Sequence, residues 1–173
     1  FRLKTNSDIE QKLNYYCGAA RFLWNKSLAM NMDRLEKGYS LLWYDELAYW
    51  TTVWKRSEEY GFLSECPSQI LQQKLRDLDR AFRDGFDRRQ PLKRIPVFKK
   101  KGRGDGIRFP QGFRIENKRL FLPKIGWVGF YKSCAIVGKV KNITLSRRGV
   151  KWFASVQVEQ SVEIGRHLSS TEI

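Results

Sequence analysis

The apolar positions at the start of the chain repeat with two different periods. Residues 1–5 alternate apolar and polar side chains, which predicts a short strand that needs partners from elsewhere in the chain. From about residue 8 to residue 37 the period becomes helical. The apolar stripe of this helix, which we expect in the core, consists of Trp24, Leu28, Met32 and Leu35.

Small and polar residues mark the boundaries of this first helix. Ser7 and Glu10 have the spacing of a capping box, in which each side chain satisfies a backbone N–H at the helix start. Gly18 predicts a pause in the helix. Gly38 predicts its end, because glycine is the usual residue after a helix C-terminus.

Two more helices are predicted before the strands begin. The first covers residues 42–59 and buries Trp43, Leu47, Trp50 and Trp54. The second begins at Pro67, because the first N–H of a helix has no partner and proline is tolerated there. Its apolar face consists of Leu71, Leu75, Leu78 and Phe82.

From about residue 87 the helical period gives way to short strands. The expected strands are 113–115, 120–122 and 127–131, followed by a hairpin of 140–146 and 151–160. The isolated first strand is expected to join them, so the predicted class is α+β, a small β-barrel split by a helical insertion. The predicted parts are 1–6 for the first strand, 7–91 for the helices, 92–160 for the barrel and 161–173 for a linker.

The charge balance of the chain indicates what class of partner it binds. The chain has 33 Lys and Arg against 18 Asp and Glu, a net charge of +15, which favours nucleic acid as the partner. An anionic membrane surface is the alternative. No apolar run approaches the roughly 20 residues of a spanning helix, and no signal segment opens the chain. We therefore expect a soluble intracellular protein.

The sequence predicts neither a metal site nor a catalytic residue. Cys17, Cys66 and Cys134 are odd in number and far apart, so we expect three reduced, buried thiols, and His167 has no cysteine pair with which to bind zinc. The carboxylates fall on helix surfaces among Lys and Arg, where solvated ion pairs are usual. The glycines of the basic segment lack the following Gly-Lys-Ser or Gly-Lys-Thr of a P-loop.

A dense basic segment lies between the helices and the strands. Over residues 87–108 its Lys and Arg face only Asp87 and Asp105. Such a segment neutralises several phosphates at once, in a sequence-independent and salt-dependent way. The predicted phosphate-binding or RNA-binding residues are Arg76, Arg94, Lys99, Lys100, Lys101, Arg103 and Arg108.

Base reading needs polar side chains on rigid elements. The candidates are Tyr44, Gln69, Gln72 and Gln111, because glutamine can bond two neighbouring groups of adenine. An ordinary solvated helix face is the alternative. Phe109, Trp127 and Tyr131 can stack on bases, and packing in the core is the alternative for all three.

Six segments of the sequence resemble the N-terminal half of TnpB, a family of transposon-encoded RNA-guided DNA nucleases similar in plan to the type V CRISPR effectors. The segments occur in the family's order and cover nearly the whole chain. They are Ala20–Lys26, Pro67–Gln73, Arg80–Phe82, Pro96–Lys100, Phe109–Gly112 and Leu122–Val128. The resemblance implies a wedge domain split by a helical recognition domain, which together hold a guide RNA and read a short motif beside a double-stranded DNA target.

The resemblance also implies which residues read this motif. They are Tyr44, Ala48, Ser68, Gln69, Gln72, Pro110 and Gln111. Ala48, Ser68, Gln69 and Pro110 differ from the residue types of characterised members. The positions of contact are therefore expected to carry over, while the motif that is read is expected to differ.

Cleavage in the family uses three carboxylates of a RuvC-like fold that holds two metal ions. We expect none of that fold in these residues, so Mg²⁺ is expected only in a RuvC-like domain beyond the predicted linker, and no cofactor in this chain. Three functions stay open: guide binding and motif reading for an RNA-guided DNA endonuclease, a nuclease-inactive RNA-guided transcriptional repressor, and an unguided structural RNA-binding protein. The resemblance implies a prokaryotic cytoplasmic location, at the nucleoid when the protein is bound to DNA.

Overall fold

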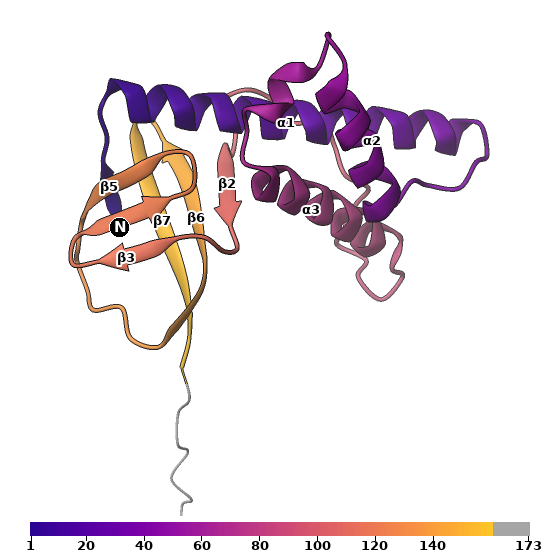
Figure 1. Cartoon of the computed structure of the whole chain (residues 1–173). Helices are drawn as coiled ribbons and strands as arrows, with labels where there is room; N and C mark the ends of the chain where they lie inside the picture. Colours follow the sequence, from indigo (N-terminus) through magenta and orange to yellow (C-terminus); the bar gives the residue numbers. More distant parts are fainter. Residues whose placement is uncertain (161–173) are drawn as a thin grey trace, which may run out of the picture.

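The computed structural model describes residues 1–160, and the linker predicted for 161–173 lies outside them. A short strand is followed by the helices, and the helices by the remaining strands (Figure 1). The elements are β1 (Arg2–Lys4), α1 (Ser7–Glu36), α2 (Tyr44–Arg56), the 3-10 helix η1 (Gly61–Ser64), α3 (Ser68–Phe86), β2 (Gly106–Phe109), β3 (Arg114–Glu116), β4 (Arg119–Leu122), β5 (Gly126–Tyr131), β6 (Lys139–Arg148) and β7 (Lys151–Glu159). Within the described part of the chain, no helix combines the length and hydropathy needed to cross a membrane.

All seven strands belong to one antiparallel sheet with the order β2-β6-β7-β1-β5-β4-β3. Strand β1 lies inside the sheet, where Leu3 is opposite Phe130 of β5 and Arg2 is opposite Phe153 of β7. The prediction that the first strand joins the later ones, with the helices inserted between them, is confirmed, as is the α+β class. The ladder ends at β2 and β3, so the described strands form an open sheet, and closure into a barrel is not confirmed.

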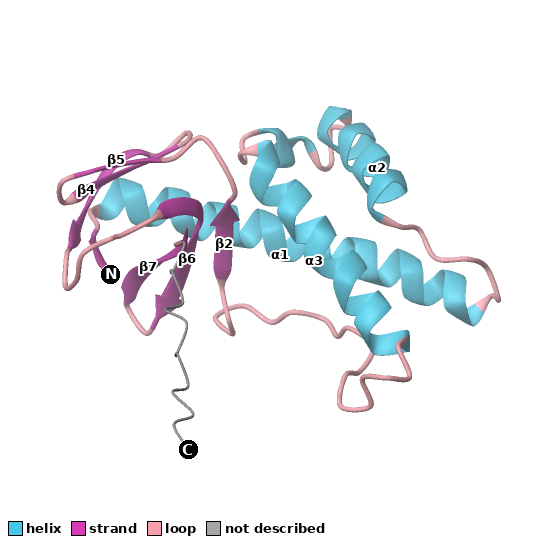
Figure 2. Cartoon of the chain, turned by 90° about the horizontal axis from the view of Figure 1, so that it is seen from below, coloured by secondary structure: helices cyan, strands magenta, loops and turns pink. Residues whose placement is uncertain are grey.

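Strand β2 was not expected from the sequence. It pairs with β6 along its whole length, with Ile107 opposite Leu145 and Phe109 opposite Ile143. Both apolar side chains of β2 are fully buried. The strand forms the edge of the sheet nearest to the helices (Figure 2) and packs against α3 and α1, so the end of the basic segment is fixed to the core.

Helix α1 is one uninterrupted helix of 30 residues, so the predicted pause at Gly18 is wrong. The predicted capping box of Ser7 and Glu10 is also wrong, because Ser7 already lies inside the helix. The N-cap is Asn6, whose side-chain oxygen accepts a hydrogen bond from the backbone N–H of Ile9 at 2.9 Å.

One hydrophobic cluster joins the helices to the sheet. Helix α1 runs past both parts (Figures 1 and 2), and its buried Leu13, Leu23 and Leu28 belong to this cluster. The predicted stripes are correct near α3 and wrong at the periphery, where Met32 of α1 and Trp50 of α2 are exposed. A helical period shows which face is apolar, but not how far along the helix a partner covers it.

Two of the three thiols are buried as predicted, and the third is not. Cys17 and Cys66 are buried, and burial raises the pKa of each thiol to about 12. Cys134 is exposed, because it lies in the loop between β5 and β6. All three thiols are free.

Candidate nucleic-acid interface

Helices α2 and α3 run antiparallel and are joined by polar contacts at both ends. At one end the Lys55 ammonium lies 3.0 Å from the hydroxyl of Ser68 and donates to it. At the other end the backbone N–H of Tyr44 donates to the Asp79 carboxylate at 3.2 Å. The Arg76 guanidinium lies 4.6 Å from the centre of the Tyr44 ring. These contacts hold the two helices along a common seam.

Most of the predicted motif-reading residues lie along this seam. Tyr44 and Ala48 are one turn apart on α2, and both are half-buried. Ser68, Gln72 and Arg76 follow at intervals of four on α3, so they share one face, and all three are exposed. The antiparallel pairing therefore brings the α2 residues together with the exposed face of α3.

Pro110 and Gln111 lie on the turn between β2 and β3, and both are exposed. This turn approaches the first turn of α3, because a Cβ added to Gly112 would lie 3.6 Å from the side-chain nitrogen of Gln69. The side-chain oxygen of Gln69 is buried without a hydrogen-bond partner among the described residues. We call the seven predicted motif-reading residues together the motif surface.

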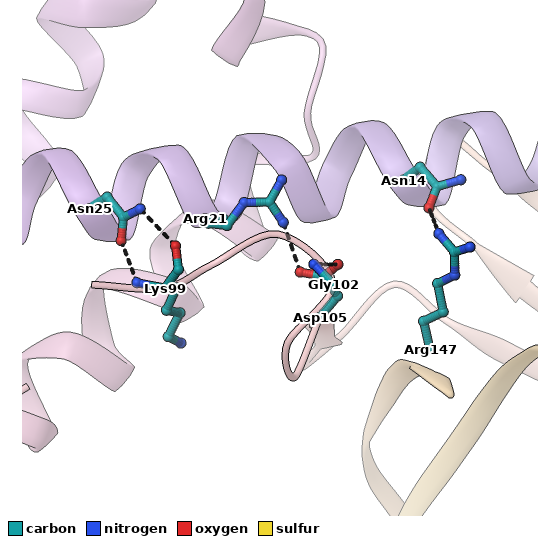
Figure 3. A network of polar contacts seen from close by, with 7 residues as sticks. All are labelled: Asn14, Arg21, Asn25, Lys99, Gly102, Asp105 and Arg147. Atoms are coloured by element: carbon teal, nitrogen blue, oxygen red, sulfur yellow. Dashed lines mark hydrogen bonds and ion pairs between the residues drawn. The ribbon is translucent and has the colours of Figure 1, made fainter. Parts of the chain in front are cut away.

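Side chains of α1 hold the basic segment through hydrogen bonds and an ion pair, including the two attachments that Figure 3 shows. The side chain of Asn25 accepts from the backbone N–H of Lys99 at 2.8 Å and donates to the Lys99 carbonyl at 3.0 Å. Farther along, Arg21 forms an ion pair with Asp105 at 2.8 Å. The loop between these attachments thus has a fixed base.

The cations of this loop are presented to solvent. Lys100, Lys101 and Arg103 are exposed. Beside Lys101 lies a cavity of about 450 Å³, which Arg21 of α1 and Arg147 of β6 also line. Neither arginine was among the predicted phosphate-binding residues. A basic residue at each position was the only available signal, because the sequence does not show that α1 and the β6–β7 hairpin meet at this loop.

Lys99 is placed differently from its neighbours, because it is half-buried. Its ammonium lies 3.6 Å from the centre of the Trp24 ring. Burial, and to a smaller extent the nearby charge of Lys74, lowers the pKa of Lys99 from 10.5 to about 8. The Lys99 ammonium therefore packs against α1 instead of extending into solvent with Lys100.

The contribution of Lys99 to stability should rise with pH between about pH 8 and pH 10, so the slope of stability against pH should be lower in a Lys99→Met variant than in wild type. The pKa of Lys99 is lower in the folded chain than in the unfolded chain, so at this residue the unfolded chain binds more protons in this range. The buried thiols of Cys17 and Cys66 act in the opposite direction, but equally in both proteins. Below this range both states are protonated, and this gain is lost. Urea unfolding at several pH values measures the slope, with Lys100→Met as the control. An equal slope in wild type and Lys99→Met would contradict this assignment.

The remaining predicted phosphate-binding arginines lie apart from one another. Arg108 of β2 is 3.7 Å from Asp77 of α3, so its charge is partly neutralised. Arg94 is exposed, and its backbone carbonyl packs closely over Gly85 near the end of α3. A Cβ added at Gly85 would lie 2.9 Å from the carbonyl oxygen of Arg94. Only Arg76 adjoins the motif surface. The predicted basic residues thus form several groups and not one patch.

Comparisons with known proteins agree on one kind of relative. Residues 1–39 match a family model described as a helix-turn-helix domain. The whole chain is 38% identical over 175 residues to the Escherichia coli (strain K12) protein named "Putative RNA-guided DNA endonuclease InsQ", and it covers 43% of that protein. It is 28% identical over 174 residues to a Streptomyces pristinaespiralis protein of like name, with 94% of this chain and 41% of that protein covered. The chain therefore spans less than half the length of these relatives.

The segment that matches the helix-turn-helix model does not fold as two helices around a turn. Residues 1–39 contain β1 and α1, and α1 continues without a break from Ser7 to Glu36. Among the helices, α1 packs mainly against α3, which comes much later in the chain. The predicted motif-reading residues lie instead on α2, α3 and the turn after β2.

Proposed function

This chain belongs to the TnpB family, and from that premise we propose that it binds a guide RNA and reads a short motif beside a double-stranded DNA target. The observation that supports the proposal best is the motif surface. Residues as distant in sequence as Tyr44 and Gln69 lie on one helix pair, and the turn that carries Gln111 approaches the same pair. Such convergence gives several polar side chains access to one short stretch of duplex.

The chemistry of the motif surface suits base edges in a major groove. A groove of B-DNA admits an α-helix, and the exposed amides of Gln72 and Gln111 can each donate to and accept from adenine. Arg76 and Lys55, at the two ends of the α2–α3 seam, supply positive charge for the phosphates that fix the register of the helices.

The basic loop suits the backbone of the guide. Lys100, Lys101 and Arg103 project from a base fixed by Asn25 and Asp105, so they can meet phosphates without first ordering the loop. Double-stranded RNA is recognised chiefly through its backbone and shape, which matches a loop of flexible cations on a fixed attachment. The net charge of +15 adds a general attraction that salt weakens.

The proposal for this chain is binding and positioning, without a cleavage step. Within residues 1–160 no three His, Cys, Asp or Glu side chains gather as ligands for a metal ion. Cleavage that depends on Mg²⁺ would belong to a RuvC-like domain outside these residues. A prokaryotic cytoplasmic location, at the nucleoid when the protein is bound to DNA, is part of the same proposal.

The test is a library of DNA duplexes with randomised positions beside a constant target, bound by the protein with guide RNA present and absent. We expect Gln72→Ala and Gln111→Ala to weaken motif discrimination by about 1–3 kcal/mol for each lost bidentate contact. Lys100→Ala should instead weaken binding to all sequences and lower the salt dependence.

Gln157→Ala is the matched control, because Gln157 is an exposed glutamine of β7 outside the motif surface. An unchanged motif preference in both test variants would remove Gln72 and Gln111 from the site. A library that shows no motif with the guide bound would favour an unguided RNA-binding protein over this proposal.

A further inference from the structure

The outward face of the sheet carries aromatic rings that each have a cation beside them. On β5 the side chains of Trp127 and Tyr131 point outward, whereas Val128 and Phe130 are buried. Across the strands, Arg2 is opposite Tyr131, and Phe121 is opposite Trp127. We call this surface the aromatic–basic face; its residues are Arg2, Arg114, Arg119, Phe121, Trp127 and Tyr131.

The cations lie close to these rings. The Arg2 guanidinium carbon is 4.1 Å from the centre of the Tyr131 ring, and that of Arg119 is 5.5 Å from the centre of the Trp127 ring. The Arg114 guanidinium carbon is 4.9 Å from the centre of the Phe121 ring. Cations in these positions support the rings and add planar guanidinium groups on which bases can also stack.

Core packing does not account for the two largest rings of this face. From the sequence, core packing and base stacking were both open for Phe109, Trp127 and Tyr131. Phe109 is fully buried in the core, but Trp127 is 37% exposed and Tyr131 is 49% exposed. Between them on β5 lies Gly129, which has no side chain and is covered by the aliphatic stem of Lys4. The result is two accessible rings about 13 Å apart along one strand, at roughly 3.3 Å per residue.

The charge of the face selects a polyanion as its partner. The strands that form it contain four Lys and Arg on this side, and Glu116 is their one carboxylate. Rings on a flat sheet cannot reach the bases of a duplex, because those bases are stacked inside it. Unpaired bases can be splayed out and stacked on aromatic side chains, which is how sheet-based RNA-binding domains hold single strands.

We propose that the aromatic–basic face binds unpaired nucleotides of an RNA, with bases stacked on Trp127 and Tyr131 and phosphates beside Arg2, Arg114 and Arg119. The identification of this RNA as the guide rests on the proposed function, whereas the chemistry of the face rests on the contacts above. The face binds a strand of several nucleotides and not a mononucleotide, because one base cannot span both rings.

The test measures the affinity of the full 173-residue chain for a fluorescein-labelled single-stranded RNA of about 12 nucleotides, within the range of known single-strand sites. The same RNA annealed to its complement and a single-stranded DNA of equal sequence are the comparison probes. Trp127→Leu and Tyr131→Leu are each expected to weaken binding of single-stranded RNA by about 5-fold to 150-fold, and to leave duplex binding within about 2-fold. Trp127→Phe, which keeps a ring, should retain most of the affinity.

Trp50→Leu is the matched control, because Trp50 of α2 is 39% exposed, nearly the same as Trp127, and lies outside the face. Thermal unfolding of each leucine variant shows that it is folded at the temperature of the assay. Wild-type RNA affinity in both test variants, or an equal loss in Trp50→Leu, would overturn the proposal. Equal affinity and equal loss with single-stranded DNA would overturn the assignment to RNA. If the wild-type protein binds single-stranded RNA through these rings but shows no DNA motif preference in the duplex library, the result would count against the proposed function alone.

Discussion

Replacing Phe109 with alanine is expected to lower the free energy of unfolding by about 3–5 kcal/mol. The ring is fully buried, and β2, which carries it, has four residues and pairs with β6 alone. Apart from its pairing with β6, so short a strand depends on the packing of its apolar side chains against α3 and α1. Because Gln111 follows Phe109 by two residues, we also expect the variant to lose the DNA motif preference. Urea unfolding monitored by tryptophan fluorescence measures the first effect, and the duplex library measures the second.

Two other variants separate the position of the turn from its chemistry. Phe98→Ala removes an exposed ring from the basic segment and should cost little stability. Gln111→Ala should keep the stability of wild type while motif discrimination falls. A loss of stability as small in Phe109→Ala as in Phe98→Ala would show that β2 does not depend on its buried ring.

Replacing Asp105 with alanine is expected to lower the free energy of unfolding by about 2–3 kcal/mol, less than for a fully buried ion pair. The side chains of Arg21 and Asp105 are 19% and 15% exposed, so water stabilises them partly. Without Asp105 the Arg21 guanidinium lies beside Lys101 and Arg147 with no counter-charge. The backbone N–H of Gly102 also loses its acceptor, because in wild type it donates to the Asp105 carboxylate at 3.1 Å.

The matched control is Asp87→Ala, which breaks an ion pair whose arginine is exposed and should cost much less stability than Asp105→Ala. A double-mutant cycle of Arg21→Ala and Asp105→Ala, measured by urea unfolding, gives the coupling energy of the pair. A coupling of zero would mean that the Arg21–Asp105 ion pair does not help to hold the loop. The affinity for phosphate should not fall in Asp105→Ala, because the change removes a negative charge from a basic cavity.

The strand pairing at the N-terminus was predictable, whereas β2 was not. Residues 1–5 alternate clearly and cannot form a sheet alone, so their backbone groups require strands from elsewhere. Strand β2 has only Ile107 and Phe109 as apolar residues, inside a segment dominated by glycine and cations, and its partner β6 is far along the chain. Two apolar positions are too few to distinguish a strand from a loop.

The same limit applies to the nucleic-acid interface. The periodicity of α3 placed Gln72 on an exposed helix face, which with its amide chemistry made it a candidate for base reading, and the resemblance to a family implied the same role. Two other features depend on tertiary contacts. Gln69 approaches the turn at Gly112, and Arg21 and Arg147 line one cavity with Lys101. No local pattern encodes them, because each joins residues that are far apart in the sequence.

The continuity of α1 restricts how this protein can change in length. One residue inserted after Gly18 would rotate everything beyond it by about 100°, and Asn25 would then face away from the backbone of Lys99. Seven inserted residues would restore the direction to within about 20° but would lengthen the helix by about 10 Å. The length of α1 thus sets the distance between the sheet and the α2–α3 pair. Only insertions close to a whole number of helical turns would keep the direction of its side chains.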